Sequence, residues 1–186
     1  MKHAFQPSQL KTLKTPSARQ ARAEGVCFYT VLQTPFGGLG ISTGTDVLGS
    51  PIVLELKYLP PNCATIPPQD ALGHEVIAQI QSYLQQPDFN FSLPLAERGT
   101  HFQQRLRRHM LHIPCGQVQT YGQVAQALRS GPRAVGQACG ANPFPLLVPC
   151  HRIVSAQGIG GFANADDGFY IGIKRWLLAH EGVRID

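Results

Sequence analysis

Hydrophobic and polar positions in the first third of the chain predict a small β-sheet. Residues 26–33 are rich in β-branched and aromatic side chains, and residues 35–38, with sequence PFGG, are a turn signal. Residues 39–43 and 52–59 continue as strands. We therefore expect a hairpin followed by a third strand.

Apolar residues then recur at helical spacing, which predicts a helix over residues 70–86 that packs on the sheet. They are Leu72, Val76, Ile77, Ile80 and Leu84. Pro60 and Pro61 end the sheet before this helix, and residues 87–99 after the helix form a predicted linker. We place a domain boundary near residue 95, between an α+β domain (25–95) and a mainly helical domain (96–186).

The second domain opens with a predicted helix whose apolar face is Phe102, Leu106, Met110 and Ile113. Thr120 then has capping-box spacing to Gln123, so a second helix is expected over residues 121–129. After the turn at residues 130–131, Pro132 suits the first position of a third helix that runs to about Gly140. Two short helices joined by a tight turn predict a helix-turn-helix.

The last of these helices is composed mainly of small residues. Gly136 and Gly140 each cost about 1 kcal/mol of helix stability relative to Ala, so their small size needs a reason. One reason is close packing against another part of the protein. The other is docking in the DNA minor groove, which is only about 6 Å wide. The composition alone favours packing.

A thiol follows with polar neighbours. Residues 146–148 predict a buried extended run, and Ile153 and Val154 are expected to return to the core. Between them lies the sequence Pro149-Cys150-His151-Arg152. Cationic or hydrogen-bonding neighbours favour the reactive thiolate, so Cys150 is a candidate nucleophile. The alternative is a buried cysteine beside a salt-bridging His–Arg pair.

Composition and charge narrow the classes of protein. The chain has 186 residues, 43% of them apolar, with no apolar run long enough to span a membrane and no secretory signal. Its five cysteines are odd in number, widely spaced and without a C-x-x-C motif, which argues against a disulfide framework or a structural zinc site and favours a reducing compartment.

The charge is unevenly distributed along the chain. Residues 101–186 carry nine basic and four acidic side chains, whereas residues 25–100 carry two basic and six acidic ones. Residues 1–24 are basic and lack periodicity, and we expect a flexible arm there. The C-terminal part therefore has the sign that suits a polyanion such as DNA, although a solvated basic surface would look the same.

The combined motifs closely resemble the O6-alkylguanine-DNA alkyltransferase family. The resemblance covers roughly residues 101–186 and rests on five segments in the family's order. They are Tyr121-Gly-Gln-Val-Ala, Arg133-Ala-Val-Gly, Asn142-Pro-x-Pro, Pro149-Cys150-His151-Arg152 and Trp176-Leu-Leu-Ala-His-Glu181-Gly. Each segment alone is weak evidence, but the combination is highly specific.

The resemblance implies a fold and a function. The fold would be α+β, with a ribonuclease H-like N-terminal domain and a winged-helix-like helix-turn-helix. The function would be DNA repair, in which a methyl or other alkyl group moves irreversibly from O6-alkylguanine, and from O4-alkylthymine as well, to Cys150. We expect a monomer that acts on double-stranded DNA through the minor groove, without metal or cofactor, in the cytoplasm or in a eukaryotic nucleus.

The resemblance also implies roles for single residues. Cys150 would accept the alkyl group, and His151, oriented by Glu181, would act as its base through a water molecule. Asn142 would brace the turn before the active site. Tyr121 would help to rotate the nucleotide and would donate a hydrogen bond to guanine N3.

Two further sets of residues follow from the resemblance. The DNA-binding residues would be Arg133, which would fill the gap left by the flipped base, and Ala134, Val135, Gly136, Gln137, Ala138, Gly140 and Arg152. The pocket would be lined by Pro145, Val148, Ile153, Phe162 and Ala163. Backbone carbonyls of Cys150 and Ile153 would accept from the exocyclic amine of guanine.

The chain departs from the family in one segment. Phe162-Ala163 stands where a Tyr-Ser pair is usual, and residues 164–172 form a longer segment with an Asp166-Asp167 pair. Three rival functions remain open: a non-catalytic protein that binds alkylated bases, a helix-turn-helix regulator, and a thiol hydrolase. Cys139 is expected to be a small filler and not a second acceptor.

Overall fold

A three-stranded antiparallel sheet begins the part of the chain that the computed structural model describes, which is residues 28–165 and 168–185. Its strands are β1 (Phe28–Thr34), β2 (Gly37–Thr45) and β3 (Pro51–Leu59), in that order across the sheet. The predicted hairpin and third strand are therefore confirmed. The basic segment 1–24 and the Asp166-Asp167 pair lie outside the described residues.

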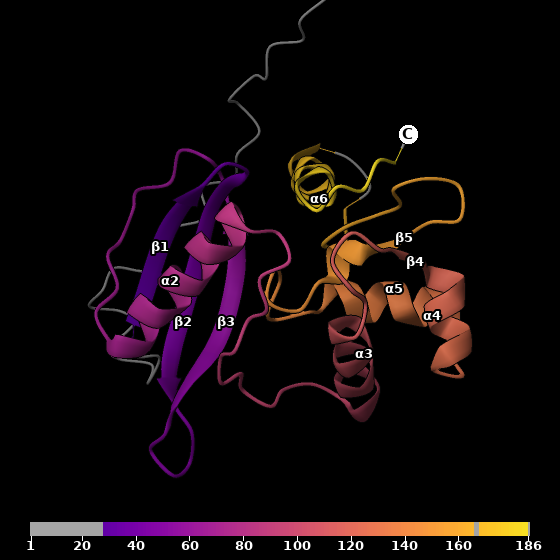
Figure 1. Ribbon diagram of the computed structural model, residues 1–186. Helices are drawn as coiled ribbons and strands as arrows, with labels where there is room; N and C mark the ends of the chain where they lie inside the picture. The colour runs from indigo at the N-terminus through magenta and orange to yellow at the C-terminus, as the bar shows by residue number, and fades with distance from the viewer. Residues whose placement is uncertain (1–27, 166–167, 186) are drawn as a thin grey trace, which may run out of the picture.

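Helix α2 (Ala71–Gln85) packs across one face of this sheet (Figure 1), as the apolar periodicity predicts. It begins after Asp70, whose carboxylate accepts a hydrogen bond from the amide of Gly73 and caps the first turn. Val76, Ile80 and Tyr83 on its inner face are buried. This helix places Tyr83 toward the C-terminal half of the molecule.

The connection after α2 covers the free edge of β3. The amide of Val53 donates to the carbonyl of Pro94, and the carbonyl of Val53 accepts from the amide of Ala96. Farther along β3, the amide of Leu56 donates to the carbonyl of Pro143. The edge strand is thereby paired with chain from the other half of the protein, which fixes the sheet beside the loop that leads to Cys150.

The C-terminal half is mainly helical. Its elements are α3 (His101–Leu111), β4 (Gln119–Thr120), α4 (Tyr121–Ala127), α5 (Pro132–Gly140), the 3-10 helix η2 (Cys150–Arg152), β5 (Ile153–Val154) and α6 (Gly168–His180). The predicted capping box of Thr120 and Gln123 is present, although α4 ends two residues earlier than expected. The parallel pair β4–β5 and helix α6 were not predicted.

The segment before Cys150 differs from the predicted extended run. Its residues are buried, as expected, but the chain turns, because the amide of Val148 donates to the carbonyl of Phe144 and Leu146 has a φ of +74°. Prolines at 143, 145 and 149 remove amide donors, so this segment cannot join a regular ladder. The nucleophile candidate therefore follows a compact turn and not a strand.

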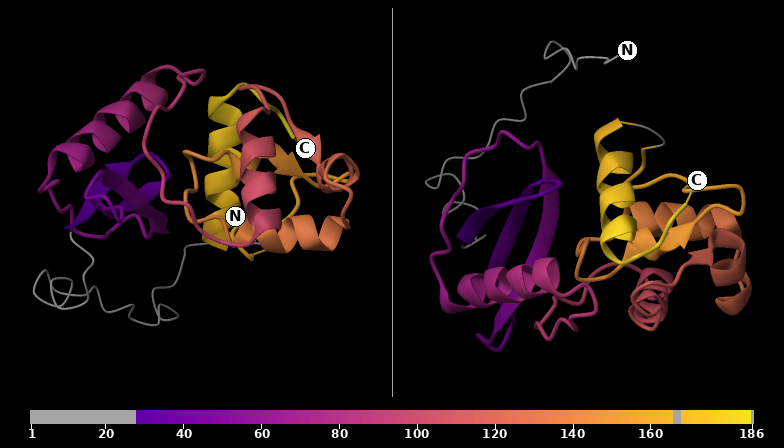
Figure 2. Two further views of the ribbon diagram at one scale, coloured as in Figure 1. Left: turned by 90° about the horizontal axis from the view of Figure 1, so that it is seen from below. Right: turned by 45° about the horizontal axis from the view of Figure 1, so that its top comes forward.

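The two halves lie side by side and share one hydrophobic core (Figure 2). Aromatic contacts connect them: the rings of Phe36 and Trp176 are 5.0 Å apart, and those of Tyr58 and Phe162 are 5.8 Å apart. Within the described residues, no helix has both the length and the apolar character needed to cross a membrane. The sheet and the helical half thus meet where β3 faces the turn before η2.

Candidate active site

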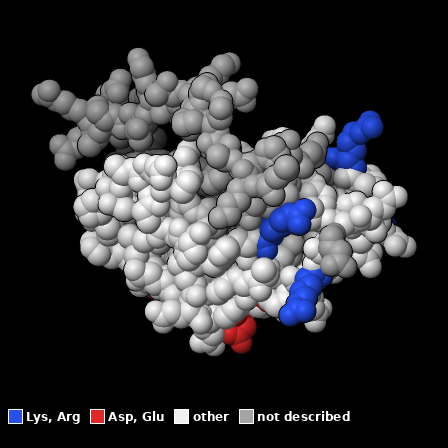
Figure 3. Space-filling view, turned by 90° about the horizontal axis from the view of Figure 1, so that it is seen from above, with Lys and Arg blue, Asp and Glu red and all other residues white. Residues whose placement is uncertain are grey.

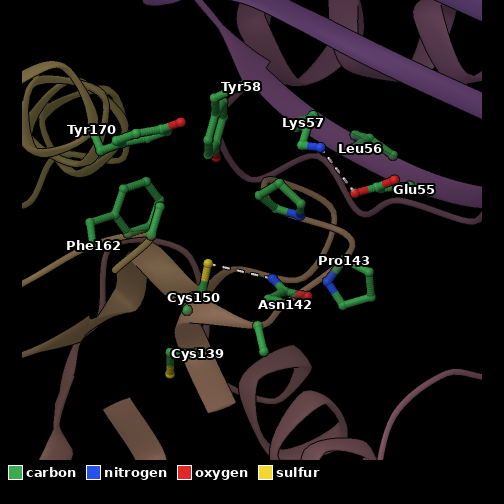
Figure 4. A pocket seen from close by; sticks show the side chains of 14 residues that line it. Glu55, Leu56, Lys57, Tyr58, Cys139, Asn142, Pro143, Cys150, Phe162 and Tyr170 are labelled. Carbon is green, nitrogen blue, oxygen red and sulfur yellow. Dashed lines mark hydrogen bonds and ion pairs between the residues drawn. The ribbon is translucent and has the colours of Figure 1, made fainter. Parts of the chain in front are cut away.

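Cys150 lies where two cavities meet. It is the first residue of η2 and is only 6% exposed. The larger cavity, of about 910 Å³, opens beside α5 and includes Tyr121, Arg133 and Gly136; we call it the groove-side cavity. The smaller one, of about 310 Å³, extends toward β3 and includes Tyr58 and Asn142; we call it the sheet-side cavity (Figure 4). A substrate can therefore approach the sulfur from the α5 side and still find space beyond it.

The surroundings of the sulfur combine burial with polar contacts. Burial raises the pKa of Cys150, and it outweighs the hydrogen bond from Asn142 Nδ2, at 3.4 Å from Sγ, and the positive charge of Lys174, which both lower the pKa. The neighbours that favour the thiolate are thus present, but the resting residue is a thiol. Forming the thiolate requires a base at the moment of reaction.

Asn142 braces the turn that carries Cys150. Its Nδ2 donates to the carbonyl of Val148 at 3.0 Å, and its Oδ1 accepts from the amide of Phe144 at 3.2 Å. The side chain therefore connects the end of α5 to both sides of the turn. This is the position that the resemblance implies for it.

His151 and Glu181 form a buried pair. His151 Nε2 lies 2.8 Å from Glu181 Oε1, and the imidazole is completely buried. Its other nitrogen, Nδ1, has no hydrogen-bond partner among the described residues. Burial lowers the pKa of His151 despite the opposing effect of Glu181, so the ring is neutral at pH 7 and can accept a proton.

Glu181 receives more donors than the resemblance implies. Its oxygens accept from Arg152 Nε at 2.8 Å, from Arg152 Nη2 at 3.0 Å and from the hydroxyl of Tyr83 at 2.9 Å. Burial alone would raise the pKa of Glu181, but the hydrogen bonds and charges of His151 and Arg152 lower it to about 2. The carboxylate stays ionised and holds the tautomer of His151 that donates from Nε2.

Arg152 was expected to contact DNA, which stays a prediction, and the structure shows that it also has partners within the protein. Its guanidinium is bound on two sides, by Glu181 and by the carbonyl of Ile113, and its side chain is only 13% exposed. In sequence, an arginine next to a nucleophile looks the same whether it faces a phosphate or a buried carboxylate. The partner that decides between them lies 29 residues later.

Lys174 is part of the site but was not among the expected residues. It is fully buried on α6, and its Nζ donates to the carbonyls of Ile153, Ile159 and Gly161 at 2.7, 2.7 and 3.0 Å. Burial lowers the pKa of Lys174 to about 8, and nearby Cys150 opposes this shift. A lysine with apolar residues three and four positions farther along the helix is the sequence signal that could have indicated it.

Helix α5 has two distinct faces. Arg133 and Gln137 are exposed, and Ala134 and Gly136 are partly exposed. The side chains of Val135 and Ala138 are buried against the core, and their expected role in binding DNA stays a prediction. They belong to the apolar face of an amphipathic helix, which packs against the core.

The two glycines of α5 have different explanations. A Cβ at Gly140 would lie 1.9 Å from Asn164 Oδ1, so a larger residue here would require the exposed side chain of Asn164 to move. A Cβ at Gly136 would meet its nearest neighbour, Tyr121, only at 3.9 Å, and Gly136 lines the groove-side cavity. Packing therefore does not account for Gly136, which favours docking of another molecule on that face.

The expected pocket residues divide into two groups. Pro145, Phe162 and Ala163 line the sheet-side cavity, and the last two line the groove-side cavity as well. The side chains of Val148 and Ile153 are buried and line neither of these two cavities, and their expected place in the pocket stays a prediction. Tyr121 lines the groove-side cavity, and its hydroxyl donates to the carbonyl of Gly161 at 2.9 Å.

The segment that departs from the family forms a tight turn. Phe162 and Ala165 exchange two backbone hydrogen bonds, and the two residues between them, Ala163 and Asn164, both have positive φ. This is the two-residue hairpin geometry that glycine and asparagine adopt most readily, and alanine adopts it at a cost. The turn presents Phe162 and Ala163 to both cavities.

On one face of the molecule, the surface charge follows the division seen in the sequence. Figure 3 shows the face that carries α6, where the visible basic side chains lie toward the C-terminal half and not over the sheet.

Cys139 is buried, and burial raises its pKa strongly, so it is a poor nucleophile. The described residues contain no cluster of three or more His, Cys, Asp or Glu side chains that could hold a metal ion.

The chain is similar to known alkyl-transfer proteins. A sequence model described as the DNA binding domain of 6-O-methylguanine DNA methyltransferase matches residues 101–183. A methylated-DNA–protein-cysteine methyltransferase of Mycobacterium bovis is 35% identical over 159 residues, covering 84% of this chain and 93% of the relative. One of Saccharolobus islandicus is 35% identical over 116 residues, or 62% and 74% of the two chains.

Solved structures show the same similarity. The crystal structure of Mycobacterium tuberculosis O6-methylguanine methyltransferase has a TM-score of 0.67 and 29% identity, covering 82% of this chain and 91% of that one. M. tuberculosis OGT in complex with DNA has a TM-score of 0.64 and 30% identity, covering 83% and 92%. The chain therefore belongs to the methylated-DNA–protein-cysteine methyltransferase family.

Proposed function

We propose that this protein repairs double-stranded DNA by moving the alkyl group of O6-alkylguanine irreversibly to the sulfur of Cys150. The observation that supports this most strongly is that the groove-side cavity beside α5 reaches Cys150, which directly precedes the buried His151–Glu181 pair. A nucleophile, a base and an orienting carboxylate are the parts that such a transfer needs. Membership of the family supports the same reaction.

Helix α5 would dock in the minor groove. Its exposed Arg133 and Gln137 face outward, and Gly136 leaves room beside Tyr121 for the sugar-phosphate backbone. Small residues suit a groove that is narrow and offers little sequence information. Binding would therefore depend on shape and charge more than on base sequence.

The damaged base would leave the stack and enter the groove-side cavity. Flipping a base costs a few kcal/mol, and the guanidinium of Arg133 would offset part of this by filling the space left in the duplex. Tyr121 would help to rotate the nucleotide. Its hydroxyl would then exchange the carbonyl of Gly161 for guanine N3 as acceptor.

The flipped guanine would pass through the groove-side cavity to the point where the two cavities meet. It would be held there between Pro145 and Phe162, with the amide of Ala163 near its O6 atom. The carbonyls of Cys150 and Ile153 would accept from its exocyclic amine. Each of them already accepts one bond, from the amide of Ile153 and from Lys174 respectively. A carbonyl oxygen has two lone pairs, so each can accept a second bond.

The chemical step would be an in-line displacement. His151 takes the thiol proton of Cys150 through a water molecule at Nδ1, while Glu181 stabilises the imidazolium that forms. The sulfur–carbon bond forms as the carbon–O6 bond breaks, and the released electron pair goes to the guanine ring. The proton removed from the thiol is returned to guanine, so the products are an unmodified base and a thioether that ends the protein's activity.

The wider expectations remain part of this proposal. O4-alkylthymine would be a second substrate, and the protein would act as a monomer in the cytoplasm or nucleus. The sheet with α2 fits a ribonuclease H-like domain, and the β4–β5 pair beside α4 and α5 fits a winged-helix-like arrangement, with the domain boundary near residue 95. No metal or cofactor enters the reaction.

Transfer of a radioactive methyl group tests the proposal. The protein is mixed with a duplex that contains one O6-[³H]methylguanine, and the label bound to protein is followed with time. We expect the label to reach one methyl group per chain and then stop. Cys150→Ser should remain unlabelled, whereas the matched variant Cys139→Ser should be labelled like the wild type.

The same experiment separates the rival functions. A non-catalytic binder or a regulator would retain the duplex without taking up label. A thiol hydrolase would release the label into solution and continue to turn over. Either outcome would overturn the proposed transfer.

A further inference from the structure

The sheet-side cavity contains more space than a methyl group needs. It meets the groove-side cavity at Cys150, at the C-terminal end of α5 and at the turn that carries Phe162, all of which line both cavities. Its far wall comes from β3, the edge strand of the N-terminal sheet, which contributes Tyr58 (Figure 4). Chain from the N-terminal half therefore borders the place where a substituent on O6 would project.

Tyr58 brings an unused hydrogen-bond donor to this wall. Its hydroxyl is buried and has no hydrogen-bond partner among the described residues. A buried hydroxyl without a partner is costly and rare in folded proteins. Burial, together with nearby Cys150, raises the pKa of Tyr58 well above its usual value, so the hydroxyl keeps its proton and can only serve as a neutral donor or acceptor.

The ring of Tyr58 is held in this orientation. It packs edge-on against Phe36, with ring centres 5.8 Å apart, and at 5.8 Å from Phe162. Figure 4 shows its hydroxyl end directed toward Cys150 and Phe162. The donor therefore points to the region beyond the reacting sulfur and not to solvent.

We propose that the sheet-side cavity is a subsite for the O6 substituent and that Tyr58 donates a hydrogen bond to an oxygen on the second carbon of that substituent, as in O6-(2-hydroxyethyl)guanine. This rests on the proposed alkyl transfer to Cys150. In-line displacement places the sulfur, the transferred carbon and O6 on one line, so the rest of the substituent projects sideways from it. The sheet-side cavity is the space available on the β3 side of that line.

The reaction itself is unchanged by this contact. The sulfur–carbon bond forms, the carbon–O6 bond breaks, the thiol proton ends on guanine, and the hydroxyl of the substituent takes no part. Because the product keeps the hydroxyethyl group on Cys150, the contact with Tyr58 persists in the alkylated protein. The subsite can therefore be tested both by rate and by stability.

The rate test compares two substituents of nearly equal size. Single-turnover rates are measured with duplexes that contain O6-(2-hydroxyethyl)guanine or O6-propylguanine, for the wild type and for Tyr58→Phe. We expect the wild type to favour hydroxyethyl over propyl by about fivefold, the effect of one neutral hydrogen bond. In Tyr58→Phe the preference should disappear or reverse, since a hydroxyl without a partner then enters an apolar space. An equal preference in both proteins would overturn the inference.

The stability test measures melting temperatures of the alkylated proteins. Each protein is alkylated to completion on Cys150, and the melting temperatures of the hydroxyethyl and propyl forms are compared. The wild type should melt higher as the hydroxyethyl form, and Tyr58→Phe should not. The unmodified variant should melt no lower than the unmodified wild type, because no existing bond is removed; a lower value would mean that the hydroxyl has a structural partner and would overturn the inference.

Different results would contradict the proposed alkyl transfer and the proposed subsite. If the wild type takes up no methyl group on Cys150, the proposed function is wrong. If methyl is transferred but the hydroxyethyl and propyl forms behave alike in both proteins, only the subsite is wrong. Should Tyr58→Phe fail to fold, the melting temperatures of the two alkylated wild-type forms decide, since equal values contradict the hydrogen bond.

Discussion

Two buried ionisable residues, Glu181 and Lys174, set the electrostatics around Cys150. Glu181 compensates for its burial with bonds from His151, Arg152 and Tyr83. Lys174 compensates with three backbone carbonyls and lowers the pKa of Cys150, although less than burial raises it. The thiol of Cys150 therefore stays protonated and unreactive at rest, while the His151–Glu181 pair that would deprotonate it lies next to it.

Replacing Lys174 with Met tests its effect on the thiol. Without the nearby positive charge, the pKa of Cys150 should rise further, so its reaction with a small methanethiosulfonate reagent should require a higher pH. Transfer from O6-methylguanine should slow by roughly tenfold or more, the effect of about 1.4 kcal/mol. The rate of thiol modification against pH is the measurement.

Arg175→Met is the matched control, because Arg175 is adjacent on α6 and exposed. Its pH profile should overlay that of the wild type. Identical profiles for Lys174→Met and the wild type would show that Lys174 serves only to hold the three carbonyls.

Single residues differ in how far the sequence could predict them. Cys150, His151, Glu181, Tyr121 and Asn142 were named from motifs, and the structure brings them into one region. The ion pair of Arg152 with Glu181 was missed because the two residues are distant in sequence. Tyr83 was missed because helical periodicity places it on a buried face, where a core role is the simplest interpretation. Lys174 was missed because its helix, α6, was not predicted, so no predicted element indicated that it is buried.

At the scale of elements, α5 connects the predicted DNA-binding surface to the active site. One side carries Val135 and Ala138 into the core, and the other presents Arg133 and Gln137 to solvent. Its C-terminal end contacts the 162–165 turn through Gly140. A substitution on this helix should therefore act on docking or on the active site according to the face it occupies.

Two alanine substitutions on α5 should have different effects. Gly136→Ala should raise the free energy of unfolding by up to about 1 kcal/mol, because alanine favours a helix and no close contact opposes it. It should also weaken binding to duplex DNA, since the new methyl group occupies the docking face. Gly140→Ala should displace Asn164 and the turn that carries Ala163, and so slow transfer.

Urea unfolding, duplex binding and single-turnover rates together measure these effects. Gly136→Ala that binds duplex as tightly as the wild type would contradict the docking face. Gly140→Ala that transfers at the wild-type rate would contradict the coupling between α5 and the turn.

Elements with strong local signals were predicted well. The β-branched and aromatic residues of β1, the turn signal after it, the periodicity of α2 and the capping box of α4 are all local features, and the structure confirms them. The two-residue strands β4 and β5 are too short for any pattern and depend on pairing across more than 30 residues. The turn at 146–148 was read as extended because its apolar residues are buried in either conformation.

At the scale of the whole molecule, the N-terminal half takes part in the active site. Tyr83 on α2 donates to the same Glu181 oxygen that binds His151. His180 Nε2 lies 2.9 Å from the carbonyl of Tyr83, which fixes α2 against α6. This contact between the halves has no signal in the sequence, because each residue is typical of an ordinary core.

Tyr83→Phe should therefore affect the reaction and not only stability. Removing the donor makes the Glu181 carboxylate more basic, which raises the pKa of His151 and shifts the acid limb of the transfer rate to higher pH. The free energy of unfolding should fall by about 1.5–3 kcal/mol, the range for a hydrogen bond to a charged group. Single-turnover rates between pH 5 and 8 provide the readout, and an unshifted acid limb would indicate a purely structural role.

The stability of the protein should decrease with acid. The unfolded chain protonates His151 below about pH 6.5, whereas the folded protein, with its lowered pKa, resists that proton. Below pH 4.5, the unfolded chain also protonates Glu181, whose folded pKa is about 2. Because the unfolded state binds more protons in both ranges, the free energy of unfolding falls as pH falls.

Urea unfolding at a series of pH values checks this expectation. The slope between pH 7 and 5 should be smaller in His151→Asn than in the wild type. Equal slopes in the two proteins would mean that burial does not change the pKa of His151.

The identity of the alkylated sulfur tests the central claim most directly. After reaction with a duplex containing O6-methylguanine, trypsin releases residues 134–152, a peptide that holds both Cys139 and Cys150. Fragmentation in the mass spectrometer should place the added mass of one CH₂ group on Cys150, with Cys139 unmodified. A methyl group on Cys139, or none on this peptide after the duplex has been repaired, would contradict the account.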